Sequence, residues 1–356
     1  MPKLDLTRAR RLKGPGGEIA RLKGAGLLWR KPDLDLPLPV QASGGIETLI
    51  EQNGMTYRVH TFLESGTLSV TQDGEVEFLV VGGGGGGGGI DNPDSLANGA
   101  GGGAGGVRKF VPGEDYNSDP APVMLTVGEH DVTIGQGGGP STGQGINATT
   151  AGQDGQPSWV LGIVAAGGGG GAVRNNAQIG GSGGSGGGGA RNANGTAAPF
   201  GLATGPGLGH DGGPAIPDFF AGAGGGGAGG PGGDSEFCAG GVGVPTAIDG
   251  ILRHYAGGGG GGPRLFIGSS PGGLGGGGNG GAATAGAPNT GGGGGGGQPG
   301  PGKPGGSGIV ILRYPIGPVD TEARMRLQNT MAPVIWGNTV PGSMLTATSG
   351  TWDPLP

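Results

Sequence analysis

One hundred of the 356 residues are glycine, and many of them stand in unbroken blocks. The longest blocks are 82–89, 167–171, 186–189, 257–262 and 291–297. Glycine buries no side chain and loses more backbone freedom on folding than any other residue. A chain of this kind is therefore either disordered or held together by contacts between its backbones.

The composition excludes two common alternatives. The blocks do not keep a Gly-X-Y period, which excludes collagen. Only 33% of the residues are hydrophobic and 4% aromatic, which excludes an ordinary leucine-rich core. The 100 glycines and 29 prolines make up over a third of the chain, above the range of about 25–30% at which disorder becomes the default. Length alone suggests two or three domains.

The charge is unevenly distributed. Residues 1–31 carry nine lysines and arginines and two acids, a net charge of +7, whereas the rest of the chain has a net charge of −13. A basic head on an acidic body suggests a segment that docks on an acidic surface. Nucleic acid is the alternative partner, but one short head is a small electrostatic footprint for it, and we expect none to bind.

Cellular location is indicated by what the sequence lacks. Cys238 is the single cysteine, so no disulfide can form within the chain. No run of about 18 apolar residues predicts a membrane-spanning helix. The basic N-terminus has no apolar stretch behind it, unlike a signal peptide. We expect assembly in a cytoplasm and no insertion into a membrane.

Residues 1–45 are predicted to form an irregular docking head with a linker. The sequence Arg-Leu-Lys-Gly occurs at 11–14 and again at 21–24, and Pro15-Gly16-Gly17 between them indicates a short hairpin. The apolar run Leu27-Leu28-Trp29 follows and is expected to act as a plug, and a proline-rich linker comes after it. The alternative is a solvated tail, but the apolar side chains of the plug would then be exposed to water without a partner. The residues expected to dock are Arg8, Arg10, Arg11, Lys13, Arg21, Lys23, Leu27, Leu28 and Trp29.

Residues 46–81 have the clearest strand pattern. Asn53-Gly54 separates two β-rich runs, and Asp73-Gly74 separates two more. These dipeptides are the strongest short-range hairpin signals, so we expect a small antiparallel meander. Val76, Phe78 and Val80 alternate with acids and should share one face of the last strand.

The region 82–315 alternates glycine blocks with short strands. We expect a hairpin of 124–127 with 131–134, a single strand over 159–165 with Trp159 in the core, and a buried closing strand over 309–314, which is apolar on both faces.

Residues 316–356 differ in composition. Residues 316–332 read as a linker, weakly helical over 319–331, and 333–356 as the opening strands of an immunoglobulin-like sandwich. Such a sandwich needs about 100 residues. We therefore expect either that the native chain continues or that a neighbouring chain completes the sheet, for example in a homotrimer.

The glycine blocks are predicted to be ordered rods. A polyproline-II chain has three residues per turn and rises about 3.1 Å per residue, so the block 82–89 would span about 25 Å. Without Cβ atoms, such rods can approach closely and exchange backbone hydrogen bonds. Residues three apart should then face outward on one edge, namely Ser182 with Ser185, and Pro301 with Pro304 and Ser307. The alternative is a flexible linker.

Several segments carry a family resemblance. His60-Thr-Phe62, Ser65-Gly-Thr67, the run 77–81 leading into glycine, and the final run 306–314 resemble the glycine-rich domain of bacteriophage tail-fibre and adhesin proteins. The resemblance covers about residues 46–315. It implies a bundle of packed polyglycine-II helices whose connecting loops contact a host receptor. In those adhesins the bundle is the tip, whereas this chain continues beyond it.

Both ends of the chain carry weaker resemblances. Residues 333–356 are similar to the opening of immunoglobulin-like repeats in phage and bacterial surface proteins. The head resembles the N-termini of tail proteins from phages and gene transfer agents of marine alphaproteobacteria. We therefore expect an all-β and irregular fold: a small antiparallel meander leading into a bundle of packed polyglycine-II helices, with a partial immunoglobulin-like segment at the C-terminus.

No motif of catalysis or of cofactor binding stands out. GxGxxG recurs by composition alone, the GxSxG at 180–184 lacks a strand–turn–helix context, and no P-loop lysine is present. The four histidines are far apart, and His210 with Asp211 are too few ligands for a metal. Cys238 reads as a small buried apolar residue. We expect no enzyme activity, cofactor or metal.

Loop aromatics are the candidates for recognition, because exposed aromatic side chains mark binding surfaces. They either cap the ends of the rods or contact a receptor. These residues are Phe200, Phe219, Phe220, Tyr255 and Phe266.

Together these features predict a structural and adhesive virion protein, a tail fibre or tail-tip component. Its head would dock on other tail or baseplate proteins, and its bundle would meet a receptor on the host surface. The alternatives are a capsid-attached fibre, a depolymerase tailspike with a carboxylate pair in a groove, and, more remotely, a glycine-rich bacterial surface protein.

Overall fold

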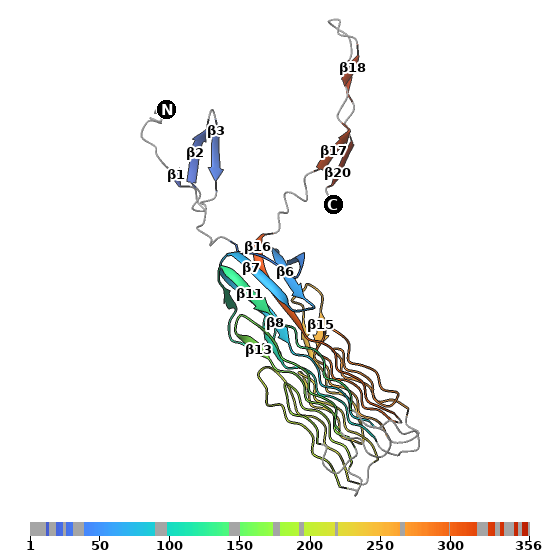
Figure 1. Ribbon diagram of the computed structural model, residues 1–356. Coiled ribbons are helices and arrows are strands. Elements are labelled where there is room, and N and C mark those ends of the chain that lie inside the picture. Colours follow the sequence, from blue (N-terminus) through green and yellow to red (C-terminus); the bar gives the residue numbers. More distant parts are fainter. Residues whose placement is uncertain are drawn as a thin grey trace. The chain divides into compact units, whose positions relative to one another are not determined.

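The computed structural model describes most of the chain (Figure 1). It covers residues 39–89, 98–141, 150–173, 179–191, 196–217, 220–263, 268–298 and 300–318, and short strands nearer both termini. These residues contain β-strands, turns and extended chain but no α-helix, which confirms the all-β class. In the same residues, no helix has the length and hydropathy of a membrane span. The chain divides into two units, 1–38 and 39–356.

The head is a three-stranded antiparallel sheet, with β1 (Leu12–Lys13), β2 (Ile19–Lys23) and β3 (Gly26–Arg30) in that order. Leu12 pairs with Ala20 on either side of the glycine turn, as the predicted hairpin requires. The Leu-Leu-Trp run is part of β3 and pairs with β2, so it is a strand and not an isolated plug. The head ends at Leu38, earlier than expected, because residues 41–43 pair within the second unit.

A β-sandwich forms the first part of the second unit. One sheet has six strands in the order β10-β8-β16-β6-β5, with β9 also paired to β8, and the other has the order β11-β7-β4. The strands are β4 (Gln41–Ser43), β5 (Ile46–Gln52), β6 (Met55–Phe62), β7 (Gly66–Gln72), β8 (Gly74–Val81), β9 (Val107–Phe110), β10 (Val123–Leu125), β11 (Gly128–Val132) and β16 (Ile309–Pro318).

One of the two predicted hairpins is present. Asn53 and Gly54 have positive φ values of 52° and 75° and join β5 to β6. The second prediction is wrong, because at Asp73-Gly74 the chain passes from one sheet to the other. The apolar faces of β7 and β8 pack against each other across one core, so the strands stack instead of pairing edge to edge.

Two further predictions about strands are corrected. β10 and β11 do not form a hairpin, since β10 pairs with β8 and β11 with β7. Residues 158–165 are not one strand but a tight hairpin of β12 (Ser158–Val160) and β13 (Ile163–Ala165), which turns at Leu161 and Gly162 with φ of 52° and 78°. The alternation in β12 buries its two outer residues and leaves Trp159 43% exposed, outside the core.

The closing strand is confirmed. β16 lies between β8 and β6, and Ile309–Tyr314 are buried on both faces. Val310 and Leu312 belong to the core between the sheets. Ile309 and Ile311 face a second core against the hairpin of β14 (Val244–Thr246) and β15 (Arg253–Tyr255). β16, which follows the last glycine block, therefore pairs with β6 and β8, which precede the first one.

The glycine blocks are ordered rods. The amides of Gly82–Gly88 form backbone hydrogen bonds of 2.8–3.1 Å that repeat every third residue. Gly82, Gly85 and Gly88 donate to 98–106, Gly83 and Gly86 to 150–157, and Gly84 and Gly87 to 300–308. None of Gly82–Gly89 has a positive φ, as a left-handed polyproline-II chain requires. Three donor directions per turn confirm the predicted geometry.

Each inner rod has six neighbours. The rod 82–89 donates to three segments and accepts hydrogen bonds from three others, 138–141, 168–171 and 294–297. The rod 99–106 does the same with a different set of neighbours. Backbone groups thus saturate one another across the bundle, and small side chains fit at intervals, as in the buried cluster of Ala100, Ala172 and Ala190.

The predicted outward-facing residues are partly confirmed. Pro301 and Pro304 are exposed, and so is Ser182, but Ser185 is completely buried. The chain bends at Gly184 and Ser185, so the two serines lie on different rods and the period of three does not connect them.

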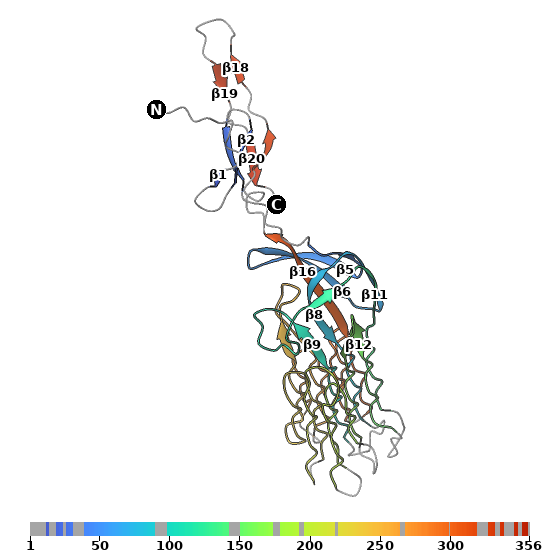
Figure 2. The ribbon, with the colours of Figure 1, turned by 90° about the vertical axis from the view of Figure 1, so that its left-hand side faces the viewer.

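The bundle has a base and a tip. The chain enters the bundle from β8 and leaves it into β16, both in the sandwich, and the rods run away from the sandwich in both views (Figures 1 and 2). We call the remote end of the bundle the tip. It includes Asn98, Arg191, Phe220, Phe237 and Gln298, as the hydrogen bonds of the neighbouring rod ends require.

The C-terminal strands form two antiparallel ribbons. β17 (Leu327–Met331) pairs with β20 (Thr351–Pro354), and β18 (Ile335–Gly337) pairs with β19 (Leu345–Ala347). The prediction of helix over 319–331 is therefore wrong for residues 327–331.

A buried histidine links the two sheets, and its environment predicts a pH dependence. His60 Nδ1 donates to the Gly44 carbonyl (2.9 Å), and Nε2 accepts from the Tyr314 hydroxyl (3.0 Å), whose oxygen accepts from the Ala42 amide (3.2 Å). Burial lowers the pKa of His60 below its usual 6.5, although the Gly44 bond and the charge of Glu47 oppose it. Neutral His60 is thus favoured in the folded protein.

Stability is expected to be complete above pH 6.5 and to fall as the pH drops below it, because the unfolded chain then binds the proton more tightly. Thermal unfolding measured from pH 8 to pH 5 checks this. A His60→Gln variant should lose most of the slope, and an unchanged slope in that variant would assign the effect to other groups.

Candidate functional site

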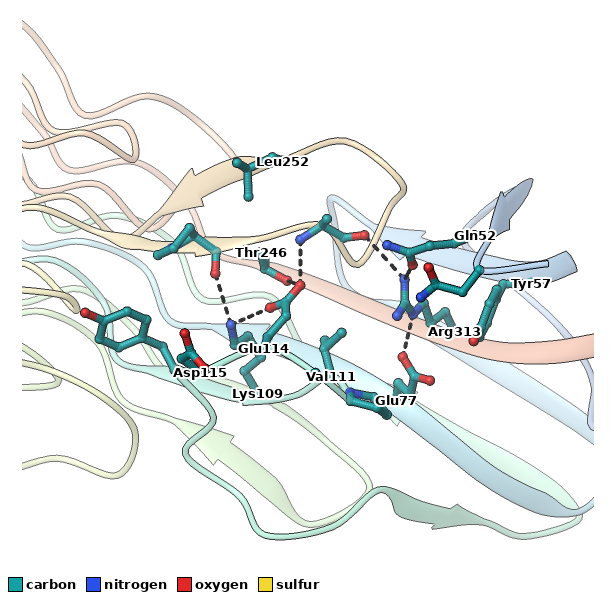
Figure 3. A pocket seen from close by; sticks show the side chains of 16 residues that line it. Gln52, Tyr57, Glu77, Lys109, Val111, Glu114, Asp115, Thr246, Leu252 and Arg313 are labelled. Atoms are coloured by element: carbon teal, nitrogen blue, oxygen red, sulfur yellow. Dashed lines mark hydrogen bonds and ion pairs between the residues drawn. The ribbon is translucent and has the colours of Figure 1, made fainter. Parts of the chain in front are cut away.

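A pocket of about 450 Å³ lies where the sandwich meets the hairpin of β14 (Val244–Thr246) and β15 (Arg253–Tyr255). Its walls come from β5, β6, β8, β16 and the loop that follows β9 (Figure 3). It contains a set of charged side chains that sequence reasoning did not single out.

Arg313 of β16 is the centre of one half of the pocket. Its side chain is only 4% exposed, and its Nε donates to Glu77 Oε2 at 2.6 Å. Nη1 donates to Gln52 Oε1 at 2.6 Å, and the guanidinium lies 4.7 Å from the centre of the Tyr57 ring (Figure 3). Burial raises the pKa of Glu77, and Arg313 offsets only part of that rise. The pairing follows from register, since Arg313 is directly opposite Glu77.

Lys109 of β9 is the centre of the other half. Its side chain is fully buried, and Nζ donates to Glu114 Oε2 (2.6 Å) and to the Pro245 carbonyl (3.0 Å). Glu114 Oε1 accepts from the Thr246 hydroxyl (3.1 Å) and the Ala247 amide (2.8 Å). These bonds tie the loop after β9 to the β14–β15 hairpin.

Two carboxylates of the pocket are paired with cations. Glu77 and Glu114 are both held by a buried cation, whereas a glycosidase needs one carboxyl free as an acid and a second as a base or nucleophile. Neither Glu77 nor Glu114 is free to take such a part. Among the residues that the structure describes, no group of three metal-ligating side chains comes together.

Comparison with known families decides the classification. Residues 62–315 match the family model of a glycine-rich domain. The chain belongs to this glycine-rich domain family. A search of the curated proteins found no match. The glycine-rich domain begins at the end of β6 and ends within β16, so it includes most of the sandwich, the whole bundle and both ion pairs of the pocket.

The predicted docking residues lie outside the glycine-rich domain. Arg8, Arg10 and Arg11 are outside the described residues. Lys13, Arg21 and Lys23 belong to β1 and β2, and the Leu-Leu-Trp run to β3. Pairing places Arg21 opposite Leu28 and Ala20 opposite Trp29, so the sheet brings basic and apolar positions side by side. Their docking role stays a prediction.

The predicted loop aromatics have different environments. Phe219 and Phe266 are outside the described residues, and Phe200 is half-buried. Phe220 is also half-buried, and the Arg191 guanidinium lies 4.2 Å from the centre of its ring, within the range of a cation–π contact.

The expectation for Tyr255 is wrong. It lies on β15 opposite Val244 and is 5% exposed, within the core beneath the six-stranded sheet. Burial raises the pKa of Tyr255 to about 12. The run Arg-His-Tyr forms a short hairpin with Val-Pro-Thr, a pairing that the sequence analysis did not recognise.

Phe237 is the exposed tip aromatic that sequence reasoning missed. It is 70% exposed, and its turn is held by hydrogen bonds to Asp234. Asp234 Oδ1 accepts from the amides of Glu236 (3.0 Å) and Phe237 (3.2 Å), and the Asp234 carbonyl accepts from the Cys238 amide (2.7 Å). The signal was present, because an aspartate that hydrogen-bonds the amides two and three residues on is a known turn former.

Cys238 confirms the expectation of a small buried residue and supplies a probe of the fold. It is 3% exposed, its thiol donates to the Ser235 carbonyl, and burial raises the pKa of Cys238 to about 12. At pH 8 we expect no reaction with iodoacetamide in the native protein and complete reaction in guanidinium, followed by mass spectrometry. Rapid labelling of the native protein would contradict the described packing.

Proposed function

We propose that this chain is a structural and adhesive virion protein, a tail fibre or tail-tip component of a phage or gene transfer agent. The observation that carries the proposal is the direction of the bundle. The chain enters and leaves the bundle through the sandwich, and the rods project from it to a tip (Figure 2). An attached base and a projecting end are what an attachment organelle needs.

The bundle also has the rigidity that a projecting fibre needs. Each inner rod is bonded to six neighbours, and a rod cannot bend without breaking hydrogen bonds in three directions. An unpaired buried backbone group costs about 1–3 kcal/mol, so local bending is opposed at each residue. A load at the tip would thus pass to the sandwich with little deformation.

The continuation of the chain beyond the glycine-rich domain does not argue against adhesion. β16 brings the chain back to the sandwich before the C-terminal strands begin, so the tip stays free of both chain ends of the domain. The exposed Phe237 adds a contact residue of the kind found at binding surfaces. The two C-terminal ribbons are compatible with the start of an immunoglobulin-like repeat.

Deletion of residues 1–31 tests the docking role of the head. The glycine-rich domain should remain folded, because its contacts are internal to the second unit, but the protein should be absent from purified particles. Immunoblots of particles check incorporation, and protection of Cys238 from iodoacetamide checks folding. Normal incorporation of the truncated protein would mean that the anchor lies elsewhere.

The salt dependence of docking gives a second measurement. The nine basic residues of the head are proposed to contact an acidic surface. Association of the full chain with particles that lack this protein should then weaken between 50 mM and 500 mM salt. Cross-linking of the head then separates tail from capsid attachment by the identity of the partner.

Competition for adsorption tests the adhesive role. Purified full-length protein should block adsorption of particles to susceptible cells, since it would occupy the same receptors. An excess of protein that binds no cell and blocks no adsorption would overturn the proposed function.

A further inference from the structure

One ion pair of the pocket beside the β14–β15 hairpin is only half closed. Arg313 Nε donates to Glu77 Oε2 at 2.6 Å, whereas Nη1 is used by Gln52 and by the carbonyls of Ala247 and Ile248. Arginine–carboxylate pairs are frequently bidentate, with two parallel hydrogen bonds. Here the second bond is missing: within the described part of the chain, Arg313 Nη2 and Glu77 Oε1 have no hydrogen-bond partner.

The two atoms of the missing bond are open to the pocket. Arg313 and Glu77 both line it, and neither atom is among the polar atoms of the described residues that are sealed from solvent without a partner. The side-chain amide of Gln52 is in the same state, since its Oε1 is held by Arg313 while Nε2 has no partner and is not sealed. The pocket thus offers two donors and one acceptor that solvent can reach.

Apolar side chains surround these polar groups. Leu252 is 69% exposed and Tyr116 is 55% exposed, and both line the mouth of the pocket, whereas Val111 is buried in its inner wall. Leu252 stands on the hairpin side of the pocket and Val111 on the opposite side (Figure 3). The volume of about 450 Å³ is within the range of about 300–1,000 Å³ that is usual for small-molecule sites.

The charges that face the pocket favour a neutral ligand. Arg313 is paired with Glu77 and Lys109 with Glu114, so the two buried cations and their carboxylates offset one another. Asp115 adds one carboxylate, which is exposed at the mouth. An anion would meet three carboxylates, and a cation would have to enter beside two buried cations, so either would lose hydration without an ion pair to replace it.

We infer that this pocket binds a neutral saccharide. One hydroxyl of the sugar accepts from Arg313 Nη2 and donates to Glu77 Oε1, which completes the half-closed pair, and a neighbouring hydroxyl accepts from Gln52 Nε2. A hydroxyl suits this position because it donates and accepts through the same oxygen. The C–H face of the sugar ring rests against Leu252. The pocket lies beside the sandwich and not at the tip, so the inference goes beyond the proposed function and does not depend on it.

Binding of the full-length chain to an array of neutral hexose and N-acetylhexosamine oligosaccharides tests the inference, with sialylated, sulfated and amino glycans beside them. Gln52→Glu keeps the oxygen that accepts from Arg313 and removes the open donor, so it should raise the Kd for the bound neutral glycan about threefold to tenfold. Leu252→Ala should raise the Kd by a similar factor through lost apolar contact. Thermal unfolding shows that both variants remain folded.

Matched controls and sugar analogues make the test specific. Gln136→Glu changes an exposed amide outside the pocket, and Leu274→Ala shortens a 65% exposed apolar side chain of another turn, and both should bind as the wild type does. Among deoxy analogues of the bound sugar, the one that lacks the bridging hydroxyl should bind at least about tenfold more weakly, because it leaves both charged groups unpaired.

Three results would overturn the inference. They are the absence of binding by any neutral glycan, binding of charged glycans alone, and equal affinity of the wild type and the Gln52→Glu and Leu252→Ala variants for the bound glycan. In the first case the half-closed pair holds only water, in the second the charge argument is wrong, and in the third the glycan binds elsewhere on the chain.

Discussion

Replacing Gly259 by valine is expected to prevent the glycine bundle from folding. A Cβ at this position would lie 2.1 Å from the Gly294 carbonyl oxygen, well inside van der Waals contact. That oxygen accepts a hydrogen bond from Gly102, and the Gly102 carbonyl accepts one from Gly259, so no group can yield without breaking the network. We expect a loss of more than about 4 kcal/mol, at the severe end of single substitutions.

Soluble yield, the thermal unfolding transition and iodoacetamide labelling of Cys238 measure the effect. Gly66→Ala is the matched control, because a Cβ there meets only the Phe62 ring at an ordinary distance of 3.8 Å. The control should unfold within about 1 kcal/mol of the wild type. A Gly259→Val protein that remains folded with Cys238 protected would disprove the packed-rod description at this position.

Replacing Arg313 by methionine should have the second largest effect. The substitution leaves the Glu77 carboxylate, whose side chain is 12% exposed, buried in the pocket without its cation. Removing one partner of a buried pair costs about 3–5 kcal/mol. Gln52 and the carbonyls of Ala247 and Ile248 also lose their donor, so the β14–β15 hairpin should loosen from the sandwich.

Denaturant unfolding of three variants separates the causes. The double variant Arg313→Met with Glu77→Met should recover most of the lost stability, because apolar groups of similar size replace a buried ion pair at little cost. Arg253→Met removes the exposed pair with Asp249, in which the arginine side chain is 51% exposed, and should cost less than about 1 kcal/mol. Equal losses for Arg313 and Arg253 would show that burial of the pair is unimportant.

The sequence predicted the parts of the fold that local chemistry controls. Asn53-Gly54 tolerates the positive φ values of a tight turn, so the β5–β6 hairpin followed from two residues. The run 309–314 is apolar on both faces and could only be a strand buried on both sides. Glycine blocks of similar length, bounded by strands, predicted rods, because a backbone without side chains is stabilised only by other backbones.

The functional candidates were less predictable. Tyr255 was expected on an exposed loop and is buried, whereas Trp159 was expected in the core and is exposed. Each lies in a three-residue strand, too short for a periodic pattern to indicate which face is covered. Phe237 escaped notice because its exposure depends on the turn built by Asp234, and Lys109 because its burial depends on a hairpin more than a hundred residues away.

The sequence by itself determined the kind of structure: rods without side chains, begun and ended by β-strands, with a basic segment ahead of them. Only the tertiary structure decided which rods are neighbours, which strands share a sheet, and which side chains meet at the tip and in the pocket. The physical reason is that every glycine presents the same amide and the same carbonyl. A glycine block therefore carries no local information about its partners, and its register is set by the apolar strands and turns that join the rods at their ends.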